Sequence, residues 1–121
     1  MNKKDFVFLN VPGLLSRYGV SSNGLPDSGR QELVLAYTNT QLEFFRDEGL
    51  FRPDSRVMNM NNAEAIVMFS DFTDEGRKFV MTAATDKWLQ SCDKKGDLAS
   101  YKDPSGLLKR LTKFRASSAG V

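Results

Sequence analysis

The chain of 121 residues carries 17 basic and 15 acidic side chains, which gives a formal net charge of +2. This length predicts one domain with a single hydrophobic core, and nine phenylalanines argue against a disordered chain. The nearly balanced charge does not favour nucleic acid as a partner, and no apolar run approaches the roughly 20 residues of a membrane span.

Histidine is absent and cysteine occurs once. Without histidine the chain lacks the commonest general base, the Ser-His-Asp and Cys-His arrangements and the usual zinc ligands. A single cysteine excludes an intrachain disulfide, which fits a reducing compartment. The sequence therefore predicts a protein without a catalytic centre, cofactor or bound metal.

The first residues, MNKKDFVFLNVPGLL, share with signal peptides a pair of lysines followed by apolar residues. Asp5, Asn10 and Pro12 interrupt the apolar stretch, and no small-residue cleavage site follows. We therefore expect an unprocessed, cytosolic protein.

The N-terminal arm, residues 1–10, is predicted to be extended or to form an edge strand, because DFVFL at 5–9 is short and apolar. Asn10 can cap a short helix that follows it, and Pro12 suits the first turn of that helix. Gly19 is expected to end it.

The segment 19–29 is turn-forming throughout. A longer helix is predicted from about residue 29 or 30 to Glu48, with Asp27 or Ser28 as the cap and Gly49 as the stop. Its apolar residues recur at helical spacing and predict one buried face. They are Leu33, Val34, Tyr37, Leu42, Phe44 and Phe45.

The segment 56–72 supports two interpretations. The β-branched run that ends at Phe69 favours a buried strand, whereas NNAEA before it favours a helix capped by Asn61 or Asn62. Periodicity cannot decide for so short a run. A short helix over about 62–70 is the favoured interpretation, because no second strong strand is available to pair with.

The stretch Ser70–Gly96 has the most consistent helix signals. Thr73 can cap the first turn, and Asp74 and Glu75 suit the positive helix end. Its apolar positions are Phe79, Val80, Ala83, Ala84, Trp88, Leu89 and Cys92. The sequence predicts one helix over 73–94 that serves as the scaffold for the others. Gly76 is expected to weaken it by about 1 kcal/mol relative to alanine.

Residues 97–102 are predicted to form a loop. Asp103 is expected to cap a last helix that runs to about Arg115, and residues 116–121 are predicted to be a frayed tail. Together the elements predict an all-α fold: a single domain over 1–121, built as a small bundle of about four to five helices with an extended or edge-strand N-terminus.

Carboxylates are the main acid–base groups of the chain. Asp71, Asp74 and Glu75 gather near one helix start, but acidic first turns are ordinary, so capping is preferred over a catalytic or metal site. Cys92 has no histidine partner and lies near a helix C-terminus, where a thiolate is disfavoured, so we interpret it as structural. No calcium-binding loop, phosphate-binding loop or dinucleotide motif occurs.

Trp88 and its aromatic neighbours allow two interpretations. Large aromatic residues dominate protein-binding hot spots, so an exposed cluster of Trp88, Tyr37, Phe44 and Phe45 would be an anchor for a partner. Packing in the core is the preferred interpretation, because these residues follow helical spacing.

Two charged sets are candidate binding surfaces. One set, on the last helix, can contact nucleic-acid phosphates or an acidic partner, or can simply be a solvated face. Its members are Lys109, Arg110, Lys113 and Arg115. The other set, Glu43, Asp47 and Glu48, can meet a basic cleft on a protein partner.

A pattern of separated residues in Ser70–Gly96 gives a family resemblance. Its members are Asp71, Phe72, Thr73, Glu75, Gly76, Phe79, Lys87, Trp88, Leu89, Asp93, Lys95 and Gly96. With DEGL at the end of the preceding helix and a leucine-containing helix downstream, the pattern resembles small bacterial immunity-type proteins encoded beside secreted toxins. The resemblance covers about residues 44–114 and carries no catalytic residue.

This resemblance implies a non-enzymatic cytosolic protein that neutralises a cognate toxin by binding it. The alternative is a small nucleic-acid-binding regulator that uses the basic residues of the last helix. A third hypothesis, an enzyme that works through carboxylates alone, requires Asp71, Asp74 or Glu75 to face a pocket.

Overall fold

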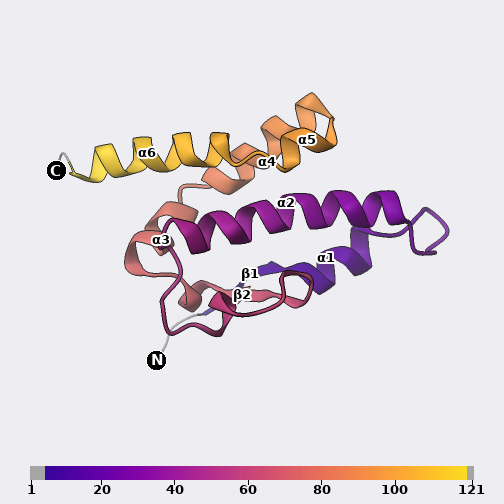
Figure 1. The fold of residues 1–121 in the computed structure, drawn as a ribbon, viewed down its shortest axis with the longest axis horizontal. Helices are drawn as coiled ribbons and strands as arrows, with labels where there is room; N and C mark the ends of the chain where they lie inside the picture. The colour runs from indigo at the N-terminus through magenta and orange to yellow at the C-terminus, as the bar shows by residue number, and fades with distance from the viewer. Residues whose placement is uncertain (1–4, 120–121) are drawn as a thin grey trace.

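Helix α2 (Ser28–Asp47) runs through the middle of the protein, between two layers of other elements (Figure 1). The computed structural model describes the backbone of residues 5–119 and the side chains of residues 5–117. One layer contains β1 (Val7–Asn10), α1 (Val11–Tyr18) and β2 (Ile66–Met68). The other layer contains α4 (Ala84–Lys95), α5 (Leu98–Tyr101) and α6 (Ser105–Ala119), and α3 (Asp74–Val80) lies near the end of α2. The predicted class, a small mostly helical bundle with a strand at its N-terminus, is confirmed.

The first two helices begin where the sequence predicts, because their caps are local. The Asn10 side chain accepts a hydrogen bond from the Gly13 N–H at 2.9 Å. The Asp27 side chain accepts one from the Arg30 N–H at 3.0 Å. Helix α2 ends just before the predicted stop, Gly49, whose φ of 70° is left-handed.

Helix α2 is buried on more than one side, where the sequence predicted a single buried face. Its buried residues follow one another too closely for one stripe; they are Val34, Ala36, Thr38, Thr40, Gln41, Leu42, Phe44 and Phe45. Thr38 and Thr40 donate their hydroxyls to the carbonyls of Val34 and Ala36, each at 2.8 Å, so they lie inside without an unpaired group. The scaffold is therefore α2 and not the predicted helix over 73–94.

Phenylalanine rings join the two layers through α2. Phe45 contacts Phe8 of β1 at 5.9 Å between ring centroids and Phe72 at 5.0 Å, both edge-to-face. Next to it Phe44 contacts Phe79 of α3 at 6.0 Å, which contacts Phe114 of α6 at 5.5 Å. These rings form a continuous aromatic core from β1 to α6.

The favoured helix over 62–70 is wrong. Short 3₁₀ turns form at Asn62–Glu64 and Phe69–Asp71. Between them Ile66–Met68 form β2, which pairs antiparallel with β1 through Leu9 opposite Val67. The partner strand is β1, in the described part of the N-terminal arm that the sequence predicts to be extended, and residues 1–4 of that arm lie outside the described part of the chain. A local pattern cannot show that an arm so distant in sequence supplies the missing ladder of hydrogen bonds.

The single helix predicted over 73–94 is interrupted. Helix α3 ends at Val80 and α4 begins at Ala84, so the two halves take separate positions in the bundle (Figure 1). Ala83 turns the chain with a left-handed φ of 65°, a conformation that costs a residue with a Cβ about 1–2 kcal/mol. Both halves carry good helix signals, so the sequence pattern hides the break.

The C-terminal predictions need two corrections. The predicted loop over 97–102 contains the short helix α5. Helix α6 begins after its predicted cap, where the Ser105 N–H donates to Asp103 Oδ1 at 2.9 Å, and continues to Ala119. The predicted fraying from residue 116 is therefore not seen as far as 119, and residues 120 and 121 lie outside the described part of the chain.

Arg46 near the end of α2 orders the segment that leads to β2, a role that the sequence did not suggest. Its guanidinium donates to the Val57 carbonyl from Nε and Nη2, at 3.0 and 2.8 Å. It also reaches the Met60 carbonyl at 3.1 Å and Asn62 Oδ1 at 2.6 Å. One side chain thus satisfies acceptors at three points of the segment, which positions β2 against β1.

Candidate functional site

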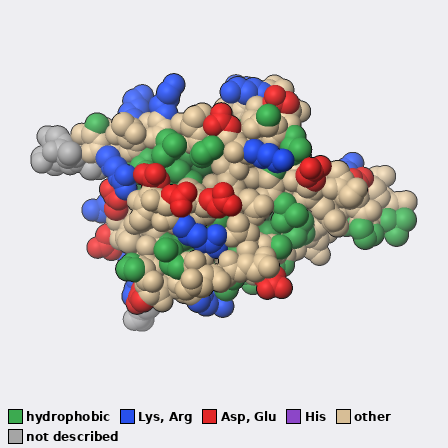
Figure 2. Space-filling view, in the orientation of Figure 1, with side chains coloured by type: hydrophobic (Ala, Val, Ile, Leu, Met, Phe, Trp, Pro, Cys, Tyr) green, Lys and Arg blue, Asp and Glu red, His purple; other side chains and the backbone are tan. Residues whose placement is uncertain are grey.

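Two of the three predicted partner-binding acids remain on the surface. Glu43 and Asp47 are exposed and lie one helical turn apart on α2. With Pro104 and Leu108 they border a shallow groove of about 130 Å³, in which Lys102 is the cation. Figure 2 shows acidic side chains along the C-terminal half of α2, beside hydrophobic side chains toward α6. We refer to Glu43, Asp47, Pro104 and Leu108 as the acidic face.

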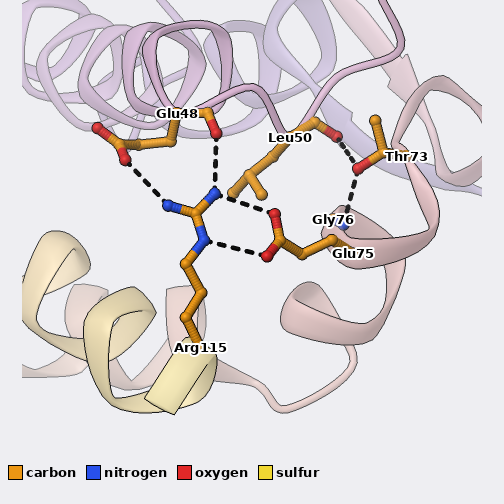
Figure 3. Close-up of polar contacts among 6 residues, drawn as sticks. All are labelled: Glu48, Leu50, Thr73, Glu75, Gly76 and Arg115. Atoms are coloured by element: carbon orange, nitrogen blue, oxygen red, sulfur yellow. Dashed lines mark hydrogen bonds and ion pairs between the residues drawn. The ribbon is translucent and has the colours of Figure 1, made fainter. Parts of the chain in front are cut away.

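The third acid, Glu48, borders the same groove but is bonded to Arg115 of the predicted basic set (Figure 3). Arg115 Nη1 lies 3.4 Å from Glu48 Oε1, and Nη2 donates to the Glu48 carbonyl oxygen at 3.0 Å. The same guanidinium donates to both carboxylate oxygens of Glu75, at 3.0 and 2.9 Å. Two residues that the sequence assigned to different partners therefore bind each other.

Glu48, Glu75 and Arg115 form a junction that ties α6 to the end of α2 and the start of α3. The hydrogen bonds and charge of Arg115 hold the pKa of Glu75 below its usual value. The hydrogen bonds that Arg115 donates to Glu75 are the main reason that the pKa of Arg115 is raised. The junction is a structural contact in which Glu48 and Arg115 are paired within the protein.

Gly76 allows the backbone of Leu50 to pass directly against α3 (Figure 3). The Leu50 carbonyl oxygen accepts from the Thr73 N–H at 2.8 Å and from its hydroxyl at 3.2 Å. Thr73 Oγ1 accepts from the Gly76 N–H at 3.0 Å, which confirms the predicted cap. A Cβ on Gly76 would lie 2.4 Å from the Leu50 oxygen, so glycine is required here and is not simply a weak point of the helix.

The three clustered carboxylates near α3 have structural partners. Asp71 accepts from the Met68 N–H at 2.7 Å and from the Ser55 hydroxyl at 2.8 Å. Asp74 pairs with Arg77 at 3.3 Å, and Glu75 belongs to the junction. Among the described residues no group of three or more acids or cysteines is placed to hold a metal ion. These contacts support the interpretation as capping and packing groups.

Part of the predicted basic set faces a second groove, between α4 and α6. Arg110 and Lys113 line this groove of about 410 Å³ together with Lys87 of α4. Arg110 Nη1 also donates to the Gly106 carbonyl at 3.1 Å. Sequence reasoning missed Lys87 as a member, because it comes from a different helix. Lys109 is exposed but does not line the groove.

Cys92 and Trp88 are packing residues. Burial raises the pKa of the Cys92 thiol, whose Sγ lies 3.3 Å from the Ser100 carbonyl oxygen, so the reactive thiolate is disfavoured. Trp88 is only 2% exposed, and its indole N–H donates to the Asp103 carbonyl at 3.3 Å. The exposed aromatic anchor is therefore wrong, and core packing is confirmed for Trp88.

A cleft of about 540 Å³ lies between α1, α2, α4 and α5, with β1 at one side. Its lining on α2 consists of Arg30, Leu33, Val34, Tyr37 and Gln41, and its lining on α4 consists of Thr85, Asp86, Leu89 and Asp93. All three tyrosines of the chain line it: Tyr18, Tyr37 and Tyr101. Sequence reasoning missed this cleft, because each helix contributes a stripe that is typical of ordinary core packing.

Two buried polar side chains line the cleft without a hydrogen-bond partner among the described residues. Gln41 is 5% exposed and Thr85 is 4% exposed. Neither side chain hydrogen-bonds to another described residue. Among the described residues, the fully enclosed side-chain atoms that lack a hydrogen-bond partner belong to Asn39 and Arg77, and not to Gln41 or Thr85. The polar atoms of Gln41 and Thr85 therefore keep some contact with solvent, which reaches them through the cleft.

Asp93 is held at the cleft by a buried tyrosine. The Tyr101 hydroxyl donates to Asp93 Oδ1 at 2.6 Å, and this bond is the main reason that the pKa of Tyr101 is raised to about 12. The Tyr37 ring lies 6.2 Å from the Tyr101 ring, and burial raises the pKa of Tyr37 as well. Both phenols stay protonated at neutral pH, so the two tyrosine side chains line the cleft as uncharged groups whose hydroxyls can donate hydrogen bonds.

The chain matches no protein-family model, and comparison with curated proteins and with solved structures found no significant match. None of the helices in the described part of the chain combines the length and the apolar character needed to cross a membrane.

Gly76→Ala is expected to destabilise the fold by about 1–3 kcal/mol, because the clash with the Leu50 carbonyl outweighs the gain in helix propensity. The measurement is the free energy of unfolding in urea. Gly29→Ala in α2 is the matched control, since its Cβ would meet only the Asp27 side chain at 3.4 Å. A Gly76→Ala variant as stable as Gly29→Ala would contradict the close approach.

Glu75→Gln is expected to lower the free energy of unfolding at pH 7 by at most about 1 kcal/mol, because the Glu75 side chain is 44% exposed. The folded-state pKa of Glu75 is lowered, so the contribution of the pair is present above the usual glutamate pKa and is lost as the pH falls through the lowered value.

The difference between Glu75→Gln and the parent should therefore shrink in urea titrations at acidic pH. Glu43→Gln, on the exposed part of α2, should differ little from the parent at either pH. A Glu75→Gln effect that is unchanged in acid would show that charge pairing with Arg115 is not its cause.

Proposed function

We propose that this protein acts by binding another protein and is not an enzyme. The observation that carries the proposal is the acidic face, where two exposed carboxylates stand beside an exposed leucine that is 38% accessible. Apolar contact area beside a charged rim is common in protein interfaces. Carboxylates on the rim favour a partner with a basic surface and accelerate its association.

The concrete form of the proposal is a cytosolic immunity-type protein that covers a basic cleft of a cognate toxin. Its support is the sequence resemblance together with the exposure of Glu43 and Asp47 on one side of α2. The engagement of Glu48 by Arg115 reduces the predicted binding set to two acids. In this proposal Leu108 contributes apolar contact with the toxin, in place of the charge that Glu48 was predicted to contribute.

The double variant Glu43→Lys with Asp47→Lys is expected to weaken binding of the partner at least about 10-fold, because it reverses the charge of the rim. The partner to test is the product of a toxin-like reading frame beside the gene, co-expressed and then titrated by calorimetry. Glu32→Lys, also exposed on α2 but outside the acidic face, is the matched control and should bind as the parent does.

Two outcomes would separate the parts of this proposal. Co-expression that yields neither a complex nor protection of cells would reject that toxin pairing. A complex with equal affinity for the double variant and for Glu32→Lys would reject the acidic face as the binding surface.

A second candidate function is anion or nucleic-acid binding by the groove of Lys87, Arg110 and Lys113. It is favoured because two helices bring three cations to one concave surface. It predicts DNA or RNA binding that weakens between about 50 and 200 mM salt, and weakens more for Lys113→Glu than for the control Lys109→Glu. A titration without salt-dependent binding would remove this candidate.

A further inference from the structure

We propose that the cleft between α1, α2, α4 and α5 binds a small organic amine with a flat, apolar body. The inference goes beyond the proposed function, because the cleft shares no lining residue with the acidic face. Its volume of about 540 Å³ falls within the usual range for small-molecule sites. The class of ligand follows from the floor, the walls and the mouth of the cleft.

The floor offers hydrogen-bonding groups that the protein leaves unused. Gln41 and Thr85 are 5% and 4% exposed, line the cleft and make no hydrogen bond to another described residue. A buried carboxamide without a partner costs free energy, so proteins seldom keep one inside unless water or a ligand satisfies it. The carboxamide of Gln41 can accept a hydrogen bond from a ligand and can also donate one.

The walls are apolar and partly aromatic. Leu33 and Tyr37 of α2 face Leu89 of α4, and the Tyr101 ring lies 6.2 Å from the Tyr37 ring. Flat ligands gain contact area between such rings and aliphatic side chains at little entropic cost to the protein. Tyrosine faces also attract cations, which favours an amine over an anion of the same shape.

The mouth carries an excess of negative charge. Asp86 and Asp93 project from one side of α4, seven residues apart, and both are exposed. Tyr101 fixes Asp93 in place with its hydrogen bond of 2.6 Å. The cation that lines the cleft, Arg30, forms an exposed ion pair with Asp27, with 3.8 Å between Nε and Oδ2. An ammonium group at the mouth therefore meets two carboxylates and one partly neutralised guanidinium.

The depth of the polar floor favours a small molecule over a protein surface. A flat protein surface would contact Asp86 and Asp93 but would not reach Gln41, whose side chain is nine-tenths buried behind the walls. A ligand with a ring and a short aminoalkyl chain can contact the floor, the walls and the mouth of the cleft at the same time. The ring fills the walls, a ring N–H or hydroxyl meets Gln41, and the ammonium remains at the mouth.

Tryptamine and indole-3-propionic acid are suitable probes, because they share the indole ring and carry opposite charges at neutral pH. In nitrogen–proton correlation spectra of the labelled protein, tryptamine should shift the side-chain amide signals of Gln41. Its dissociation constant should be about 1 mM or lower, as expected for a ligand of this size. Indole-3-propionic acid should bind at least about 10-fold more weakly.

Two variants test separate parts of the site. Asp86→Asn with Asp93→Asn should weaken tryptamine at least about 10-fold, while an asparagine oxygen at 93 can still accept the Tyr101 bond. Gln41→Leu should weaken tryptamine at least about 5-fold while changing folding stability little, because the carboxamide that it removes makes no hydrogen bond to another described residue. Asp74→Asn, exposed on α3 and outside the cleft, is the matched control.

The proposal is overturned if tryptamine leaves the Gln41 signals unmoved. It is also overturned if indole-3-propionic acid binds as tightly as tryptamine, or if the Asp86→Asn and Asp93→Asn double variant binds tryptamine as well as Asp74→Asn does. Weakening by both test variants with an unaffected control supports it. None of these outcomes depends on whether a protein partner binds the acidic face, so the two proposals fail or stand separately.

Discussion

The buried ring of Phe45 on α2 is the contact on which both layers of the protein depend. It meets Phe8 from β1 and Phe72 before α3, while its neighbour Phe44 meets Phe79 of α3. Two adjacent residues on a helix point in directions about 100° apart, so burying both requires neighbours on two sides. The two-strand sheet with α1 supplies one side, and α3 with the later helices supplies the other (Figure 1). Helix α2 therefore behaves as a core element that still presents exposed acids along its remaining side.

Charge pairing within the protein decides which charged residues remain free to bind. Arg115 is fixed by Glu75 and Glu48 because α6 packs beside the end of α2, so one member of each predicted binding set is used internally. Glu43 and Asp47 remain exposed beside Leu108, and Arg110 and Lys113 line a groove with Lys87. Opposite charges thus gather on separate surfaces of a nearly neutral chain. This separation, and not the net charge, gives the protein surfaces that distinguish basic from acidic partners.

The cleft is a consequence of the same architecture. Helices α1, α4 and α5 approach α2 from different directions, and the short side chain of Thr85 with the polar Gln41 leaves space between them. A core of this size can bury such groups only if their polar atoms are satisfied or keep access to solvent. The cleft provides that access, and the same opening makes Gln41 available to a ligand. The acidic face and the cleft occupy different sides of α2, so one helix supports two independent candidate sites.

Local patterns in the sequence were enough to predict the helix caps at Asn10, Asp27, Thr73 and Asp103, whose partners lie within one helical turn. Apolar spacing and composition also predicted the long helix, the extended segment that contains β1, and the packing roles of Trp88 and Cys92. Contacts distant in sequence were needed to show that β2 is a strand, that Ala83 interrupts the predicted helix and that Gly76 permits the approach of Leu50. They were also needed to show that Arg115 bonds to Glu48 and that Gln41 lines a cleft. The physical reason is range: a cap is satisfied by a group two or three residues away, whereas the Arg115 bonds join residues 40 and 67 positions apart, which no local pattern encodes.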